Sequence, residues 1–153
     1  MTTLIATVRP HAWDFPLFLH VFGAMILVGG LLTAAACLGL ARGDARFLRL
    51  GYRSLLAVAL PGWILMRIAA EWIASKEGWT HKGVPIPKWL DIGVILADLG
   101  GFILLISLIV GGIGVRRLRA GGGSGLLRTT LALSVVLLGI YVVAVWAMAG
   151  KPT

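Results

Sequence analysis

FLHVFGAMILVGGLLTAAACLGL, residues 18–40, is the stretch that decides the fold class of this chain. It contains no Asp, Glu, Lys or Arg, and it exceeds the ~20 apolar residues that a helix needs to cross a bilayer. A backbone in lipid must satisfy its own hydrogen bonds, so such a stretch is typical of a transmembrane helix. Three more apolar stretches follow, and the expected spans are about 15–40, 53–75, 89–115 and 127–149. The sequence therefore predicts an all-α integral membrane protein, a four-helix bundle that forms one domain over residues 1–153.

The composition agrees with a chain that has lipid as its solvent. Of 153 residues, 59% are hydrophobic and only 13% are charged, whereas soluble domains carry about 25% charged residues. The single cysteine, Cys37, lies within the first span, which excludes a disulfide framework and a cysteine-based zinc site. The opening residues 1–16 lack a basic start and a small-residue cleavage site, so we expect no cleaved signal peptide.

The basic residues predict how the helices are oriented. Eight arginines lie in the two loops that join span one to span two and span three to span four: Arg42, Arg46, Arg49, Arg53, Arg116, Arg117, Arg119 and Arg128. Cytoplasmic loops are enriched in Lys and Arg, so we expect an N-out/C-out topology in the inner (plasma) membrane. Five tryptophans fall at the opposite boundary, where aromatic belts form: Trp13, Trp72, Trp79, Trp89 and Trp146.

The arginine loops have two interpretations that the sequence leaves open. One is contact with anionic lipid head groups at the cytoplasmic face, where each basic residue contributes about 1 kcal/mol. The other is a docking surface for a partner, which the flexible GGGSG at 121–125 would suit. The net charge of +8 does not indicate nucleic-acid binding, because the charges lie in short loops that carry topology signals.

Ionisable residues within the spans indicate a buried polar cluster in the outer half of the membrane. Such residues are costly in lipid and are by default candidates for function. His20 and Glu71 lie roughly 6–8 Å below the outer helix ends, and Arg67 lies roughly 12–14 Å below, at 1.5 Å per residue. Asp98 matches Arg67 in depth, and the forked guanidinium can bond two carboxylates. Glu71 shares the face of Arg67 four residues away, and Trp63, one turn further in, is placed to stack on the guanidinium.

Two interpretations of this cluster stay open. In the first, Arg67, Glu71 and Asp98 are buried and fix the register of the bundle, since breaking one partner of a buried ion pair is expensive. His20 would then hydrogen-bond a carboxylate or a backbone carbonyl. In the second, the cluster is a proton- or ligand-handling pocket that opens to the outer side.

Small residues indicate where helices approach closely. Gly23, Gly30 and Cys37 recur every seven residues on the first span, and Gly101 and Gly112 lie on the Asp98 side of the third. Small faces let membrane helices pack tightly, either within one chain or between two copies.

Metal and haem sites have limited support. Haem with two axial histidines would need a partner for His20, and the other two, His11 and His81, fall outside the spans. Copper favours Met, Cys and His, and Met66 and Met148 lie in the outer half where they could join His20. No nucleophile–base pair, phosphate loop or metalloprotease motif is present, so the sequence does not support catalysis.

FLHVFGAMILVGGLL at 18–32 and VWAMAGKPT at 145–153 resemble a group of small bacterial inner-membrane proteins. The group includes the CopD-like copper-resistance proteins and a related four-helix family of unknown function. The resemblance implies a multi-pass membrane protein, and the CopD connection implies copper passage, with His20 at the matching position.

Two hypotheses follow for the function. The chain is a non-catalytic accessory or scaffold subunit that binds partners through its helices and arginine loops, in a homo-oligomer or a larger membrane complex. Alternatively, it is a small transporter or a copper- or haem-handling protein that uses His20 with the cluster of Arg67, Glu71 and Asp98.

Overall fold

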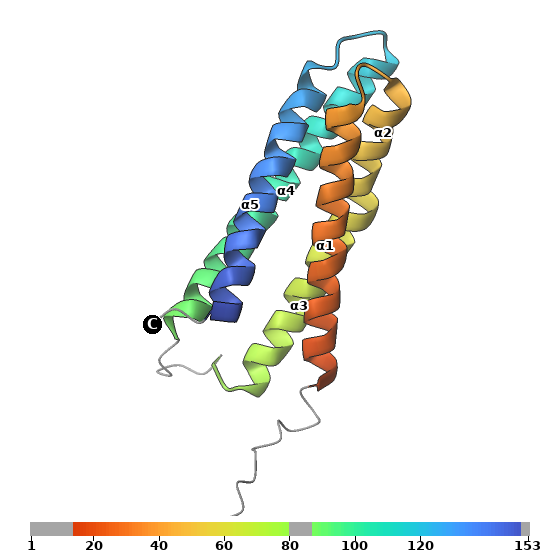
Figure 1. Ribbon diagram of the computed structural model, residues 1–153. Helices are drawn as coiled ribbons and strands as arrows, with labels where there is room; N and C mark the ends of the chain where they lie inside the picture. Colours follow the sequence, from red (N-terminus) through yellow and green to blue (C-terminus); the bar gives the residue numbers. More distant parts are fainter. Residues whose placement is uncertain (1–13, 80–86, 151–153) are drawn as a thin grey trace, which may run out of the picture.

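The computed structural model describes residues 14–79 and 87–150, which contain helices and turns and no strand (Figure 1). The elements in chain order are α1 (Asp14–Leu40), α2 (Ala45–Ser54), the π-helical η2 (Leu55–Ala59), α3 (Leu60–Lys76), α4 (Lys88–Arg119) and α5 (Gly125–Gly150). α2, η2 and α3 follow one another without a break, so the chain runs up and down as four long helices. The predicted all-α four-helix fold is confirmed.

All four long helices have the length and composition of membrane spans. They contain 27, 32, 32 and 26 residues, so each exceeds the ~30 Å thickness of the hydrocarbon core at 1.5 Å per residue. Large apolar side chains such as Phe18, Met25, Ile109 and Val142 are exposed on the outside of the bundle. A surface of this kind suits lipid, and the chain is therefore a polytopic membrane protein.

The two ends of the bundle differ in composition. The turns at 41–44 and 120–124 lie together at one end, which we call the arginine end (Figure 1). α1 and α4 begin, and α3 and α5 end, at the other, which we call the tryptophan end because Trp72, Trp79, Trp89 and Trp146 lie there. Trp13, which the sequence analysis added to this belt, lies outside the described residues.

Most of the arginines lie on helices and not in loops, which corrects the sequence analysis. α2 begins at Ala45 because the Asp44 carboxylate accepts a hydrogen bond of 2.7 Å from the backbone N–H of Arg46. α4 continues to Arg119 and ends where Gly121 has a φ of +79°, in the turn that closes many helices. Only Arg42 remains in a turn; the other seven occupy the ends of α2, α4 and α5: Arg46, Arg49, Arg53, Arg116, Arg117, Arg119 and Arg128.

A proline explains the π-helical segment in the second span. Pro61 has no N–H, and in a regular α-helix its ring would clash with the carbonyl of Ala57. The helix widens just before it, and the backbone N–H of Leu60 donates to the carbonyl of Leu55, five residues back. The helix thereby passes the proline without breaking.

α1 packs so closely on η2 and α3 that their backbones are in contact. A Cβ atom on Gly23 would lie 2.5 Å from the backbone nitrogen of Met66, and one on Gly30 would lie 2.6 Å from that of Ala59. Across the interface, a Cβ on Gly62 would lie 2.6 Å from the nitrogen of Leu27. The first-span glycines therefore serve packing within the chain, one of the two uses that the sequence left open.

The remaining helices form a second pair. α4 packs along α5, α5 also contacts α1, and α3 and α4 make few contacts with each other. Figure 1 shows α1 with α3 and α4 with α5 as two pairs that separate toward the tryptophan end. The core between the pairs is built mainly of leucines: Leu27, Leu31, Leu55, Leu104 and Leu137. The boundary between α3 and α4, which we call the α3–α4 seam, is only loosely packed.

Gly30→Ala should lower the free energy of unfolding by about 1–3 kcal/mol, because the new methyl group would overlap the backbone and Cβ of Ala59, which have no flexible side chain to move aside. Gly29→Ala is the matched control, since a Cβ there meets nothing within 4 Å. It should leave stability unchanged or raise it by up to about 1 kcal/mol. Helix content followed during thermal unfolding in detergent measures both. Equal losses in the two variants would contradict the close approach.

Candidate functional site

A cleft of about 230 Å³ lies at the tryptophan end, where the α3–α4 seam opens. α3 and α4 provide its sides, and α1 and α5 each contribute one functional side chain. These lining residues include His20, Met66, Arg67, Glu71, Asp91 and Met148. The structure thus gathers most of the residues that the sequence singled out, from four helices, around one opening that we call the tryptophan-end cleft.

Arg67 connects the two helices beside this cleft. Its Nη1 lies 2.6 Å from Oε1 of Glu71, one turn along α3. Its Nε donates to Oδ1 of Asp98 on α4 at 2.9 Å, and Nη2 lies 3.5 Å from Oδ2 of the same carboxylate. One guanidinium therefore holds two carboxylates and crosses the seam, which is the geometry in which arginine exceeds lysine.

The cluster lies at the surface of the bundle, whereas the sequence analysis expected it to be buried. The side chains of Glu71 and Asp98 are 58% and 53% exposed, and that of Arg67 is 24% exposed. The physical reason is the arrangement of helices: α3 packs on α1 and α4 packs on α5, so neither covers the outer edge of the seam. The charges face the surroundings of the chain.

Trp63 closes the seam one turn deeper than Arg67. Its Nε1 donates to the backbone carbonyl of Ala97 on α4 at 3.2 Å, and its ring lies directly over Gly101. The indole is thus directed across the seam, and not along α3 onto the guanidinium as the sequence analysis suggested. Gly101 provides the space for it, because any Cβ atom there would overlap the ring.

His20 is held in one tautomer by the backbone of α3. Its Nδ1 lies 3.0 Å from the carbonyl oxygen of Met66, and a carbonyl can only accept, so Nδ1 carries the hydrogen. In the neutral ring the lone pair is then on Nε2, and His20 is one of the residues that line the cleft. A backbone carbonyl was one of the two partners that the sequence suggested for this histidine.

Two methionines bring soft sulfur to the same cleft. Met66 is almost fully buried on α3, and Met148 reaches from α5 to pack its thioether against Gly93 of α4. A Cβ atom at Gly93 would overlap the methyl group of Met148, so this glycine admits the sulfur. His20, Met66 and Met148 are therefore the residues here that fit a soft metal ion.

A site for a metal ion harder than Cu(I) has less support in the described part of the chain. No group of three or more His, Cys, Asp or Glu side chains there is placed to hold a metal ion. His11 and His81 lie outside the described residues. The cleft volume of about 230 Å³ is also below the ~300–1,000 Å³ of sites for drug-sized ligands, which favours an ion over a haem.

Asp91 is a lining residue that the sequence analysis did not select. It lies inside the first turn of α4 and borders the cleft. Its spacing of seven residues from Asp98 is the signal that would have indicated it, because two helical turns place both carboxylates on neighbouring positions of one face.

Comparison of the chain with protein-family models, with curated proteins and with solved structures gives no significant match.

Arg67→Gln should destabilise the protein more than either carboxylate change, because it leaves two carboxylates without their shared cation. We expect a loss of about 2 kcal/mol in the free energy of unfolding, against less than about 1 kcal/mol for Glu71→Gln, which keeps the bond across the seam. Unfolding of the three proteins in the same detergent measures the difference. Losses of equal size would show that Arg67 does not join the helices.

Proposed function

We propose that this chain is a non-catalytic accessory subunit that binds a partner membrane protein through the charged α3–α4 seam. The observation that carries the proposal is the exposure of Glu71 and Asp98, which are both more than half exposed on a surface that is otherwise apolar. Charged side chains in that position are stabilised by contact with polar groups, and a partner helix provides such groups.

The depth of the cluster makes this exposure costly. Arg67 lies nine residues before the end of α3 at Lys76, and Asp98 lies ten residues after the start of α4 at Lys88. At 1.5 Å per residue, both are about 14–15 Å from the helix ends. A charged residue at the centre of a span costs about 2.5–3.5 kcal/mol on insertion scales, so burial against a polar partner surface is favourable.

The charge of the cluster defines the chemistry of the partner. Two carboxylates share one guanidinium, so the cluster carries one net negative charge. A lysine, an arginine or hydrogen-bond donors on a partner helix at the same depth would complement it. Two copies of this chain facing each other at the seam would place two negative clusters together, which favours a different membrane protein as the partner.

The proposed setting is a bacterial inner membrane with the arginine end in the cytoplasm. Eight arginines at one end and the described boundary tryptophans at the other support this orientation through the positive-inside rule and the aromatic belt. The likeness of residues 18–32 and 145–153 to small four-span bacterial proteins, distantly CopD-like, supports the same setting.

Photo-crosslinking in native membranes tests the partner. A photoreactive residue in place of Leu99, which is exposed beside Asp98, should yield one discrete adduct with another membrane protein. The same residue in place of Val142, exposed on α5, is the control and should label lipid.

The charge requirement completes this test. Combining Glu71→Gln with Asp98→Asn changes the cluster charge from −1 to +1, so the adduct from position 99 should be lost while the fold is kept. An adduct that persists in this double variant, or that appears equally from position 142, would rule out recognition through the seam.

A second candidate function is the handling of Cu(I) at the tryptophan-end cleft. It is favoured by the bond between His20 and the carbonyl of Met66, which directs the lone pair to Nε2, and by the two thioethers of Met66 and Met148. Cu(I) prefers such soft ligands, and a histidine that binds a metal usually donates a hydrogen bond from its other imidazole nitrogen.

Metal binding by the purified protein tests this candidate. Competition with a Cu(I) chelator should show one bound ion, with affinity lowered at least about tenfold by His20→Ala or Met148→Leu. Met25→Leu is the control, because Met25 is exposed on α1 outside the cleft. Equal losses in all three variants would exclude the cleft, and a haem absorption band in the purified protein would replace copper with haem.

A further inference from the structure

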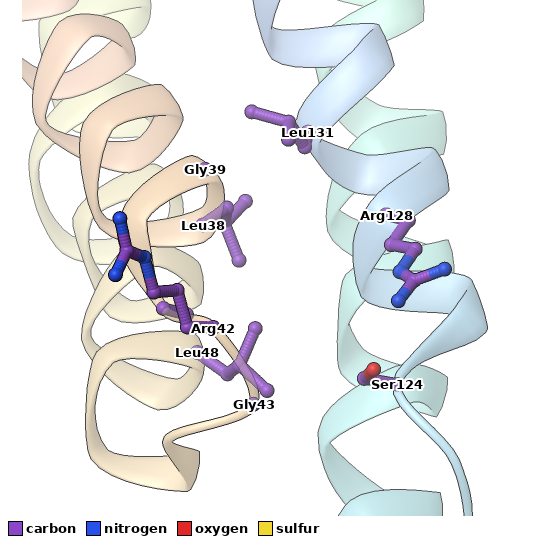
Figure 2. Close-up of a pocket in the computed structure, with 9 residues that line it drawn as sticks. Leu38, Gly39, Arg42, Gly43, Leu48, Ser124, Arg128 and Leu131 are labelled. Carbon is purple, nitrogen blue, oxygen red and sulfur yellow. The ribbon is translucent and has the colours of Figure 1, made fainter.

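A second cleft lies at the arginine end, between the α1–α2 turn and the start of α5. Its volume is about 440 Å³, larger than that of the tryptophan-end cleft. Figure 2 shows the side chains of Leu38, Leu48 and Leu131 pointing into the space between the helices. Arg42 and Arg128 stand on either side of this space, with Ser124 beside the second. We call it the arginine-end groove; leucines line its interior, and polar groups that include the two cations line the rest.

The two arginines are available to a ligand. Figure 2 shows their guanidinium groups on opposite sides of the groove and turned away from each other, and both residues are exposed. Neither forms an ion pair with a carboxylate in residues 14–79 or 87–150. Asp44 is the one acidic residue among the eight arginines of this end, and its carboxylate is engaged by the backbone of Arg46. The groove therefore has unneutralised positive charge at its rim.

The turn that carries Arg42 fixes its position at the rim. The backbone N–H of Asp44 donates to the carbonyl of Ala41 at 2.6 Å, and Arg42 and Gly43 both have positive φ, +42° and +94°. This is the pattern of a type I′ turn, whose first central position favours Asn, Asp or Gly. An arginine occupies it at a conformational cost of about 1 kcal/mol. Asn, Asp or Gly at position 42 would therefore stabilise the turn better than arginine does.

The surroundings of the groove indicate which anion it takes. Leu40 follows the lining residue Gly39, Val135 lies one turn beyond the lining residue Leu131 on α5, and both are exposed, so the apolar lining continues into the lipid-facing surface of the bundle. A soluble phosphate would bind the two arginines, but it has no apolar group that would pack on the leucines. A glycerophospholipid has an anionic phosphate for the rim and an acyl chain for the leucine-lined interior.

We propose that the arginine-end groove binds one anionic glycerophospholipid, whose phosphate draws the exposed side chains of Arg42 and Arg128 toward the rim and whose acyl chain lies along Leu38 and Leu131. This assignment singles out two of the eight arginines and makes the lipid a specific ligand, in contrast to the general attraction of a basic surface for anionic head groups. It is independent of the partner proposed for the α3–α4 seam, at the opposite end of the bundle.

Native mass spectrometry of the full chain tests the proposal. The protein is released from detergent that contains equal amounts of phosphatidylglycerol and phosphatidylcholine with the same acyl chains. The wild-type chain should retain one phosphatidylglycerol in preference to phosphatidylcholine. Arg42→Asn with Arg128→Gln should weaken that binding about 30-fold, since each of the two lost cations contributes to attraction of an anionic lipid. Asn tolerates the positive φ of position 42, so the turn is kept.

Two further variants distinguish lipid binding in the groove from general attraction to the positive charge of this end. Arg117→Gln with Arg119→Gln removes the same charge from the same end without touching the groove, and should change binding less than about threefold. Gly39→Phe keeps every arginine but fills the groove, because a Cβ on Gly39 faces the Leu131 side chain at 3.9 Å. It should abolish retention of the lipid.

Several results would overturn the proposal. Equal losses in the two arginine pairs would mean surface charge alone, and equal retention of both lipids would mean no recognition of the phosphate. Displacement of the lipid by millimolar inorganic phosphate would indicate a soluble anion. Unchanged lipid binding by Gly39→Phe would show that the acyl chain does not occupy the groove. If Gly39→Phe does not fold, judged by helix content and elution volume, the comparison of the two arginine pairs decides.

Discussion

The contact of the α1 backbone with the backbones of η2 and α3 is the constraint on which the rest of the bundle depends. Lipid provides no hydrophobic force that drives two helices together, so close packing of small residues takes its place. Gly23, Gly30 and Gly62 bring these backbones into contact, and this commits one face of α3 to α1. α4 then pairs with α5, and the seam between α3 and α4 is left to the indole of Trp63 and the guanidinium of Arg67.

The sequence predicted the four helices and the pairing of Arg67 with Asp98, because hydropathy and depth along a helix are properties of single segments. It did not predict the exposure of the carboxylates, which depends on which helices pair with which. Hydropathy also placed the start of the second span near residue 53, whereas a side-chain cap at Asp44 starts the helix at Ala45. The arginine-end groove was likewise beyond sequence reasoning, since Arg42 and Arg128 are brought together only by the packing of α5 beside α1.

Arg67 belongs to two features at once. Its guanidinium binds Asp98 at the surface of the seam, and the same side chain borders the tryptophan-end cleft. An anion bound in the cleft would compete with the two carboxylates for one cation. The cleft and the seam are therefore electrostatically joined, so a substitution at Arg67 affects both, whereas His20 and Met148 belong to the cleft alone.

The π-helical segment before Pro61 sets the rotational phase of the second span. A π turn holds one residue more than an α turn, and each residue of an α-helix advances the chain by about 100°. If residues 55–59 were α-helical, the same number of residues would turn Arg67 by about that angle relative to the arginines of α2, away from Asp98. The π turn and the number of residues between Asp44 and Arg67 are thus linked, and a homologous chain with the charged seam would be expected to keep both, or to lose the π turn and one residue together.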